Sequence, residues 1–192
     1  MNSIAIVTED RLTEAVCERL AADLGIEVHM KLRKDGCGYL KSKLDSFMQM
    51  SLHYPVLVVT DLDEKTCAPS LLRSWLNGRV LPPEMMLRVA VREVEAWLMA
   101  DHEAFGDFIG ARINFDVESL ADPKARLLSL ARNANRNVRE ELVAARGAVA
   151  SQGVGYNIRL GNFVANSWSP ERAAANSDSL FRTIRKLRQL LL

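Results

Sequence analysis

The feature that most constrains the fold is an alternation of short apolar runs with longer segments of helical periodicity in the first half of the chain. Residues 55–60 (Pro-Val-Leu-Val-Val-Thr) are apolar at successive positions and predict a strand buried on both faces. Similar runs predict strands at residues 4–7, 26–32 and 86–91. Apolar residues at helical spacing predict helices over 12–24, 40–48, 69–76 and 94–98, several of them ending at Gly or Asn-Gly.

Strand–helix repeats of this length favour parallel strands joined by right-handed crossovers. We therefore predict an α/β fold with a doubly wound, mainly parallel sheet of about four strands and helices on both faces. From Asp122 onward the periodicity becomes helical. The expected caps are Asp122 before Pro123, Asn157, Ser169 before Pro170, and Ser177 or Asp178. The predicted organisation is an α/β core over 1–111 and a helical C-terminal part over 112–192, packed together as one compact unit.

Composition excludes several classes of protein. The 192 residues are 48% hydrophobic, enough for a core without disulfide or metal support. No apolar run approaches the roughly 18 residues of a membrane span, and residues 1–7 lack the basic and apolar regions of a signal peptide. Cys17, Cys37 and Cys67 form no CxxC pair, so we interpret them as free thiols in the cytoplasm, where we expect this protein.

Charge is divided unevenly along the chain. Residues 1–111 carry 12 basic against 17 acidic side chains, a net charge of −5, whereas residues 112–192 carry 13 against 7, a net charge of +6. This division is compatible with a carboxylate site beside a phosphate-binding surface, or with two solvated faces of opposite sign.

Acidic residues follow three of the four predicted strands. They are Glu9 and Asp10, then Asp61 and Asp63, then Glu93 and Glu95 after Arg92. Ligands of open parallel sheets bind at the carboxyl ends of the strands. Side chains two residues apart on a strand share a face about 6.6 Å apart along it, so we expect Asp61 and Asp63 to bracket one hard cation. Oxygen ligands of this kind suit Mg²⁺, which keeps several waters and meets substrate phosphates.

Plainer interpretations compete with each of these signals. Asp is common in loops after strands, and Glu93 and Glu95 fit the first turn of a helix, where negative charge is favoured. Trp75 and Trp97 are expected in the core. Gly36-x-Gly38 is a weak phosphate-loop signal, because no helix-opening GK[ST] follows.

These residues resemble the Toprim fold of topoisomerases, primases and overcoming-lysogenization-defect nucleases. The resemblance begins with Val7-Thr8-Glu9-Asp10 and is most specific in the Arg-Glu-Val-Glu-Ala-Trp-Leu string at 92–98. The chain is similar in detail to a family of small bacterial Toprim-like proteins that are often found beside ATPase partners in phage-defence loci. The resemblance covers nearly the whole chain, and its further segments are Thr60 to Asp63, Cys67 to Leu71, Arg88 to Val91, Asp122 to Lys124, Gly155 to Asn157 and Ser177 to Leu180.

The resemblance implies Mg²⁺- or Mn²⁺-dependent hydrolysis of DNA or RNA. Toprim proteins use the acid after the first strand as general acid/base or metal ligand and a DxD to hold magnesium, which here implies Glu9, Asp61 and Asp63. Nuclease members place Gly after the first acid and a second acid four residues beyond it. Here Asp10 replaces that Gly, and the spacing runs from Asp10 to Glu14, so the choice between Glu9 and Asp10 stays open.

The remaining candidate residues would complete the site. Glu14, Glu93 or Glu95 would hold a second ion. Arg92 and Lys124 would hold phosphate, and Lys124 is also a candidate catalytic residue. Arg182, Arg185, Lys186 and Arg188 would extend that contact, although a solvated helix face explains them as well, and Lys124 could be an ordinary surface lysine.

Rival functions are a catalytically silent Toprim-like module that binds metal or a partner ATPase and, less favoured, a receiver-like signalling domain. A receiver would end near residue 120, where this chain becomes helical. The expected partners are nucleic acid, an ATPase and a second copy in a homodimer, with no membrane.

Overall fold

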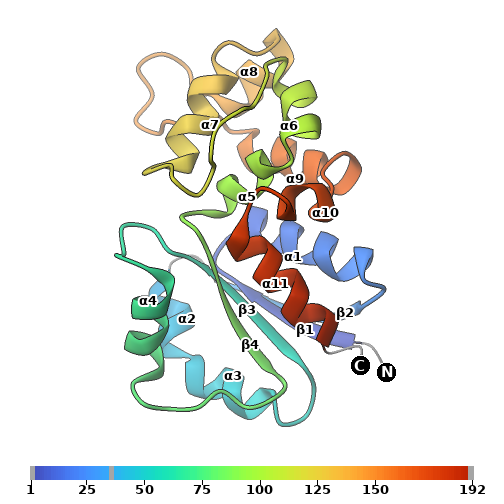
Figure 1. Ribbon diagram of the computed structural model, residues 1–192. Helices are drawn as coiled ribbons and strands as arrows, with labels where there is room; N and C mark the ends of the chain where they lie inside the picture. The colour runs from blue at the N-terminus through green and yellow to red at the C-terminus, as the bar shows by residue number, and fades with distance from the viewer. Residues whose placement is uncertain (1–2, 35–36, 190–192) are drawn as a thin grey trace.

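The sheet is four-stranded and entirely parallel, with the order β2-β1-β3-β4 (Figure 1). The computed structural model describes residues 3–34 and 37–189. Its strands are β1 (Ser3–Thr8), β2 (Glu27–Arg33), β3 (Val56–Asp61) and β4 (Met85–Ala90). The chain runs outward from β1 to β2 and then returns to β3 on the other side of β1. This confirms the predicted doubly wound α/β fold and places its topological switch point between β1 and β3.

Helices cover both faces of the sheet (Figure 1). On one face lie α2 (Cys37–Ser42), α3 (Leu44–Met50) and α4 (Ala68–Leu76), where two short helices replace the single one predicted over 40–48. On the other face lies α1 (Arg11–Asp23), which ends before Gly25 in the left-handed conformation (φ 66°). Gly36 of the weak phosphate-loop signal lies outside the described residues.

The rest of the chain is helical and includes two helices, α6 and α8, that the sequence pattern did not reveal. The helices are α5 (Val94–Ala100), α6 (His102–Ile109), α7 (Pro123–Ala131), α8 (Arg136–Leu142), α9 (Tyr156–Asn166), α10 (Pro170–Ala174) and α11 (Asp178–Arg188).

Three of the predicted caps are confirmed and one is wrong. The side chains of Asp122, Ser169 and Ser177 accept hydrogen bonds from the first turns of α7, α10 and α11. Asn157 instead lies inside α9, whose N-cap is Gly155. A Cβ at Gly155 would lie 2.9 Å from the Cβ of Glu141, so close approach to the end of α8 requires glycine at this position.

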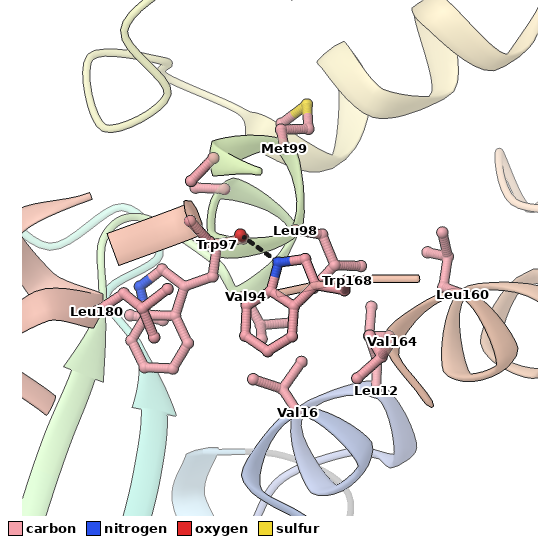
Figure 2. Close-up of a cluster of buried hydrophobic side chains, with 14 of the residues drawn as sticks. Leu12, Val16, Val94, Trp97, Leu98, Met99, Leu160, Val164, Trp168 and Leu180 are labelled. Carbon is pink, nitrogen blue, oxygen red and sulfur yellow. Dashed lines mark hydrogen bonds between the residues drawn. The ribbon is translucent and has the colours of Figure 1, made fainter. Parts of the chain in front are cut away.

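The C-terminal helices share one continuous hydrophobic core with the sheet face that α1 covers. Trp97 and Trp168 are fully buried at its centre between α1, α5 and α9, and the Trp168 Nε1–H donates to the Trp97 carbonyl at 3.0 Å (Figure 2). Trp75 is buried against the opposite face. Trp75 and Trp97, which we expected in the core from the sequence, are therefore both core residues. Among residues 3–34 and 37–189, no helix is both long and apolar enough to cross a membrane.

Candidate functional site

The carboxyl ends of β1 and β3 lie side by side at the switch point, because Ala5 pairs with Val56 and Val7 with Val58. We use the name carboxyl edge for this end of the sheet, with the acidic residues that follow its strands, Glu9, Asp61, Asp63, Glu93 and Glu95. Glu9 directly follows β1, and its Oε1 accepts a hydrogen bond from the Thr60 hydroxyl at the end of β3. Partial burial raises the pKa of Glu9, with smaller contributions from neighbouring carboxylates, while the Thr60 hydrogen bond opposes the rise. The fold thus directs Glu9 across the switch point toward β3.

Asp10 is committed to a different task. Its Oδ1 accepts from the backbone N–H groups of Leu12 (2.7 Å) and Thr13 (2.9 Å), and its Oδ2 accepts from the Thr13 hydroxyl at 2.9 Å. These bonds make Asp10 the N-cap of α1. Of the two acids after β1, Glu9 is therefore the one whose carboxylate is available to a ligand.

Asp61 ends β3 in a largely buried position. Its Oδ1 accepts from the backbone N–H of Val94 at 3.0 Å, at the start of α5. Burial raises the pKa of Asp61 well above its ordinary value, and surrounding carboxylates, Glu95 first, raise it further. Among the described residues Asp61 takes part in no ion pair, so it is a partly buried acid among like charges.

The expectation that Asp61 and Asp63 share one strand face is wrong. The Leu62 N–H donates to the carbonyls of Ala90 (3.0 Å) and Arg92 (2.8 Å), and the Asp63 N–H donates to Arg92 at 3.0 Å. Asp63 then adopts a left-handed conformation with φ 52°, and its side chain is exposed. The chain turns toward the end of β4 immediately after Asp61, which ends the two-residue alternation on which the prediction depended.

Glu93 and Glu95 are held by residues from the helical part of the chain. Glu93 Oε2 accepts from the Lys124 N–H at 2.9 Å, and Glu95 Oε1 accepts from the Tyr156 hydroxyl at 2.8 Å. The Lys124 Nζ lies 4.0 Å from Glu95 Oε1 and 5.1 Å from the centre of the Tyr156 ring. Burial, followed by the charge of Glu93, raises the pKa of Glu95 to about 7, against the opposing effects of Lys124 and Tyr156.

The two remaining candidates flank this edge. Glu14 lies on the β2 side, where its Oε1 is 2.9 Å from the Arg33 guanidinium. Arg92 donates to the Asp63 carbonyl at 3.0 Å and, with Asp63 and Glu93, lines an open cleft of about 530 Å³. Sequence reasoning missed Thr60 as the partner of Glu9. Tyr156 belonged to the motif at 155–157, but nothing local connected it with Glu95.

The donor chemistry of this edge suits a hard divalent cation, because the carboxylates gathered around Asp61 supply oxygen ligands and negative charge. Among the described residues, however, no three Asp, Glu, His or Cys side chains are grouped closely enough to hold a metal ion. Asp10 and Glu93 are engaged by helix backbones, and Asp63 is exposed where it lines the cleft beside Arg92. Glu9 and Asp61 therefore fit as the fixed ligands, and Asp63 would have to turn inward to join them.

No protein-family model, curated protein or solved structure matches this chain, so the function of the carboxyl edge has to be argued from its own residues.

Proposed function

We propose that this protein is a Mg²⁺-dependent phosphodiesterase of the Toprim type that hydrolyses nucleic acid at the carboxyl ends of β1 and β3. The observation that carries the proposal is the position of Glu9 and Asp61. They come from adjacent strands at the switch point, where open α/β sheets bind ligands, and neither of them forms an ion pair within the described part of the chain. A structural role alone does not require two unneutralised acids at this place.

A bound divalent cation would supply Lewis-acid stabilisation of the charge that develops on a phosphoryl group. Glu9, Asp61 and Asp63 are the residues that would hold it. Asp61 is kept in place by the Val94 N–H, so its carboxylate is fixed before any ligand arrives.

The surrounding residues have separate tasks in this proposal. Glu9, with a raised pKa and the Thr60 hydroxyl on its Oε1, is placed to accept or return a proton. Arg92 lies beside the cleft and contributes positive charge where phosphate would enter. Lys124 points at Glu95 and the Tyr156 ring, so we assign it to orienting that pair as well as to binding phosphate.

A catalytically silent module of the same fold is the second candidate. The observation that favours it is the absence, among the described residues, of three metal-binding side chains in one group. In this alternative the carboxyl edge binds a partner protein, such as an ATPase, without cleaving nucleic acid.

The first test is cleavage of plasmid, single-stranded DNA and transfer RNA in Mg²⁺, Mn²⁺ or EDTA. We expect metal-dependent cleavage by the wild type and none by Asp61→Asn, because that variant loses a charged ligand but keeps an acceptor for Val94. Asp63→Asn should behave similarly. Asp107→Asn, an exposed site on α6, is the matched control and should cleave normally. Wild-type cleavage by purified Asp61→Asn would exclude the proposed site.

The second test separates the two acids after β1. Glu9→Gln should lower the cleavage rate by about 10²–10⁴-fold, as expected for a proton-transferring group. Asp10→Asn should change it little, since Asn is as good an N-cap as Asp. The reverse order would assign the active acid to Asp10.

A further inference from the structure

A second cavity lies along β4, the edge strand of the sheet, and its character is opposite to that of the carboxyl edge. It occupies about 530 Å³ between α4 on one face of the sheet and α11 on the other, and we call it the β4 groove. Figure 1 shows these two helices on either side of the strand. Its apolar wall includes Leu72, Leu87 and Val89.

Positive charge dominates the β4 groove. Five basic side chains line it, Arg88, Arg92, Arg182, Arg185 and Lys186, against two acidic ones, Glu118 and Asp178.

Both acids of the groove already have protein partners. Asp178 forms an i,i+4 ion pair with Arg182 at 2.8 Å. Glu118 Oε1 accepts from the Ser177 hydroxyl at 2.6 Å and from the N–H and hydroxyl of Ser179 at 2.8 and 2.7 Å. The groove therefore has an excess of positive charge that the described residues do not neutralise.

Arg88 shows that this excess extends beneath the exposed helix face. Its side chain is partly buried, and its Nε donates to the Thr183 hydroxyl at 3.3 Å. Burial lowers the pKa of Arg88, as do the nearby charges of Arg182 and Arg185. A guanidinium in such surroundings is stabilised by an anion, and its planar fork matches phosphate oxygens.

The β4 groove also reaches the carboxyl edge. Arg92 lines both cavities, because it lies at the end of β4 while its guanidinium donates to the carbonyl of Asp63. An extended polyanion in the groove would therefore lead to the acids after β1 and β3.

We propose that the β4 groove binds the sugar–phosphate backbone of single-stranded nucleic acid and guides the strand toward the carboxyl edge. This inference rests on the proposed function and specifies its substrate. An unpaired strand suits a groove with both basic and apolar walls, because its phosphates and its bases can each find a matching surface. The bases of a duplex are stacked inside it and would leave the apolar wall without a partner.

The competing occupant is an acidic peptide that adds a strand to the open edge of β4. Part of that edge is already used, since the Val91 N–H is 3.4 Å from the Ser179 hydroxyl. The connection through Arg92 to the carboxyl edge and the cluster of guanidiniums favour phosphate.

The test measures binding without cleavage. Fluorescence anisotropy with a labelled single-stranded oligonucleotide in EDTA, across a salt series, compares wild type with the double variant Arg185→Gln/Lys186→Gln. We expect affinity to fall at least about tenfold and the slope of log K against log salt to become shallower by about 1.4, the value for two lost phosphate contacts on a single strand.

A matched double variant removes the same charge elsewhere. Arg132→Gln/Arg139→Gln changes an exposed residue that follows α7 and an exposed residue of α8, neither of which lines the groove. It should bind like the wild type. Equal weakening of both doubles, or no weakening of the groove double, would overturn the proposal.

Two competitors complete the design. Tighter binding of duplex than of single strand, or displacement of the oligonucleotide by a polyglutamate peptide at lower concentration than by unlabelled single strand, would also overturn the proposal. Because metal is absent, a protein that binds single strands through the groove but never cleaves them would refute only the proposed activity. If Arg185→Gln/Lys186→Gln still cleaves nucleic acid and binds the single strand as tightly as the wild type, only the proposed role of the β4 groove would be refuted.

Discussion

Two aspartates of this protein, the buried Asp101 and the partly buried Asp61, occupy opposite electrostatic environments. Asp101, at the start of α6, accepts from the Arg172 guanidinium through both oxygens at 2.8 Å, and its Oδ2 also accepts from the Ser169 N–H at 2.8 Å. Asp61, at the end of β3, accepts from the Val94 N–H and otherwise faces carboxylates. One negative charge is neutralised where it is buried, and the other is not.

On the proposed function, this difference separates a structural acid from one that binds metal. Asp101 joins the start of α6 to α10 and its N-cap Ser169, so its ion pair with Arg172 holds these helices together. Asp61 lies at a position where its negative charge opposes folding unless a cation arrives. The unpaired charge at the carboxyl edge therefore lowers the stability of the folded protein, and we expect a cation bound at that edge to restore it.

The sharpest test of this contrast applies the same substitution to both aspartates. Asp101→Asn should destabilise the protein by about 1.5–3 kcal/mol, because it replaces one of the carboxylate oxygens that accept from Arg172 and Ser169, and should lower Tm by about 3–12 °C. Asp61→Asn in EDTA should melt at or above the wild type, because it relieves like-charge repulsion. Thermal unfolding followed by circular dichroism measures both. A large loss of stability in Asp61→Asn would place the two aspartates in the same structural class.

The pH dependence of stability extends the comparison to Glu95. Its pKa of about 7 in the folded protein exceeds the ordinary 4.5, so the native state binds the additional proton. The contribution of Glu95 to stability is therefore full below about pH 4.5 and is lost as pH rises through 7, a change on the order of 3 kcal/mol.

Glu95→Gln should remove that dependence. In EDTA at pH 8 it should melt about 6–12 °C above the wild type, while the Tyr156 hydroxyl keeps an acceptor. Three charged groups face Glu95. Glu93 raises the pKa of Glu95 and Lys124 lowers it, while Glu95 in turn raises the pKa of Asp61. A variant that melts below the wild type at pH 8 would show that the Glu95 carboxylate is ionised and stabilising.

Metal should reverse the penalty at Asp61 and leave Asp101 untouched. Mg²⁺ at a hundred times its Kd adds about 2.7 kcal/mol to the stability of a protein that binds it only when folded, which corresponds to about 5–11 °C in Tm. We expect this rise in the wild type and little response in Asp61→Asn. Asp101→Asn should start lower and rise like the wild type. Melting curves of all three that are unaffected by Mg²⁺ and Mn²⁺ would remove the metal site.

The fold and its helix boundaries were largely predictable because their causes are local. The buried strand at 55–60, the caps at Asp122, Ser169 and Ser177, and the left-handed Gly25 are each specified by a few neighbouring residues. The role of Asp10 as an N-cap also had a local signal, because it is an acid immediately before a helix. Its position beside Glu9 nevertheless left both residues as candidates for the acid of the site.

The sequence by itself determined that acids would follow three of the four strands, and parallel strands bring their carboxyl ends to one edge of the sheet. Only the tertiary structure decided what each acid does there. Thr60 and Val94 select Glu9 and Asp61 across the switch point, whereas the turn at Asp63 exposes a residue that the spacing had placed beside Asp61. The tertiary structure also brings Arg88 and Arg185 close together beside β4, because α11 packs against a strand about a hundred residues earlier in the chain. Contacts of this range depend on how the core packs, and no local pattern encodes them.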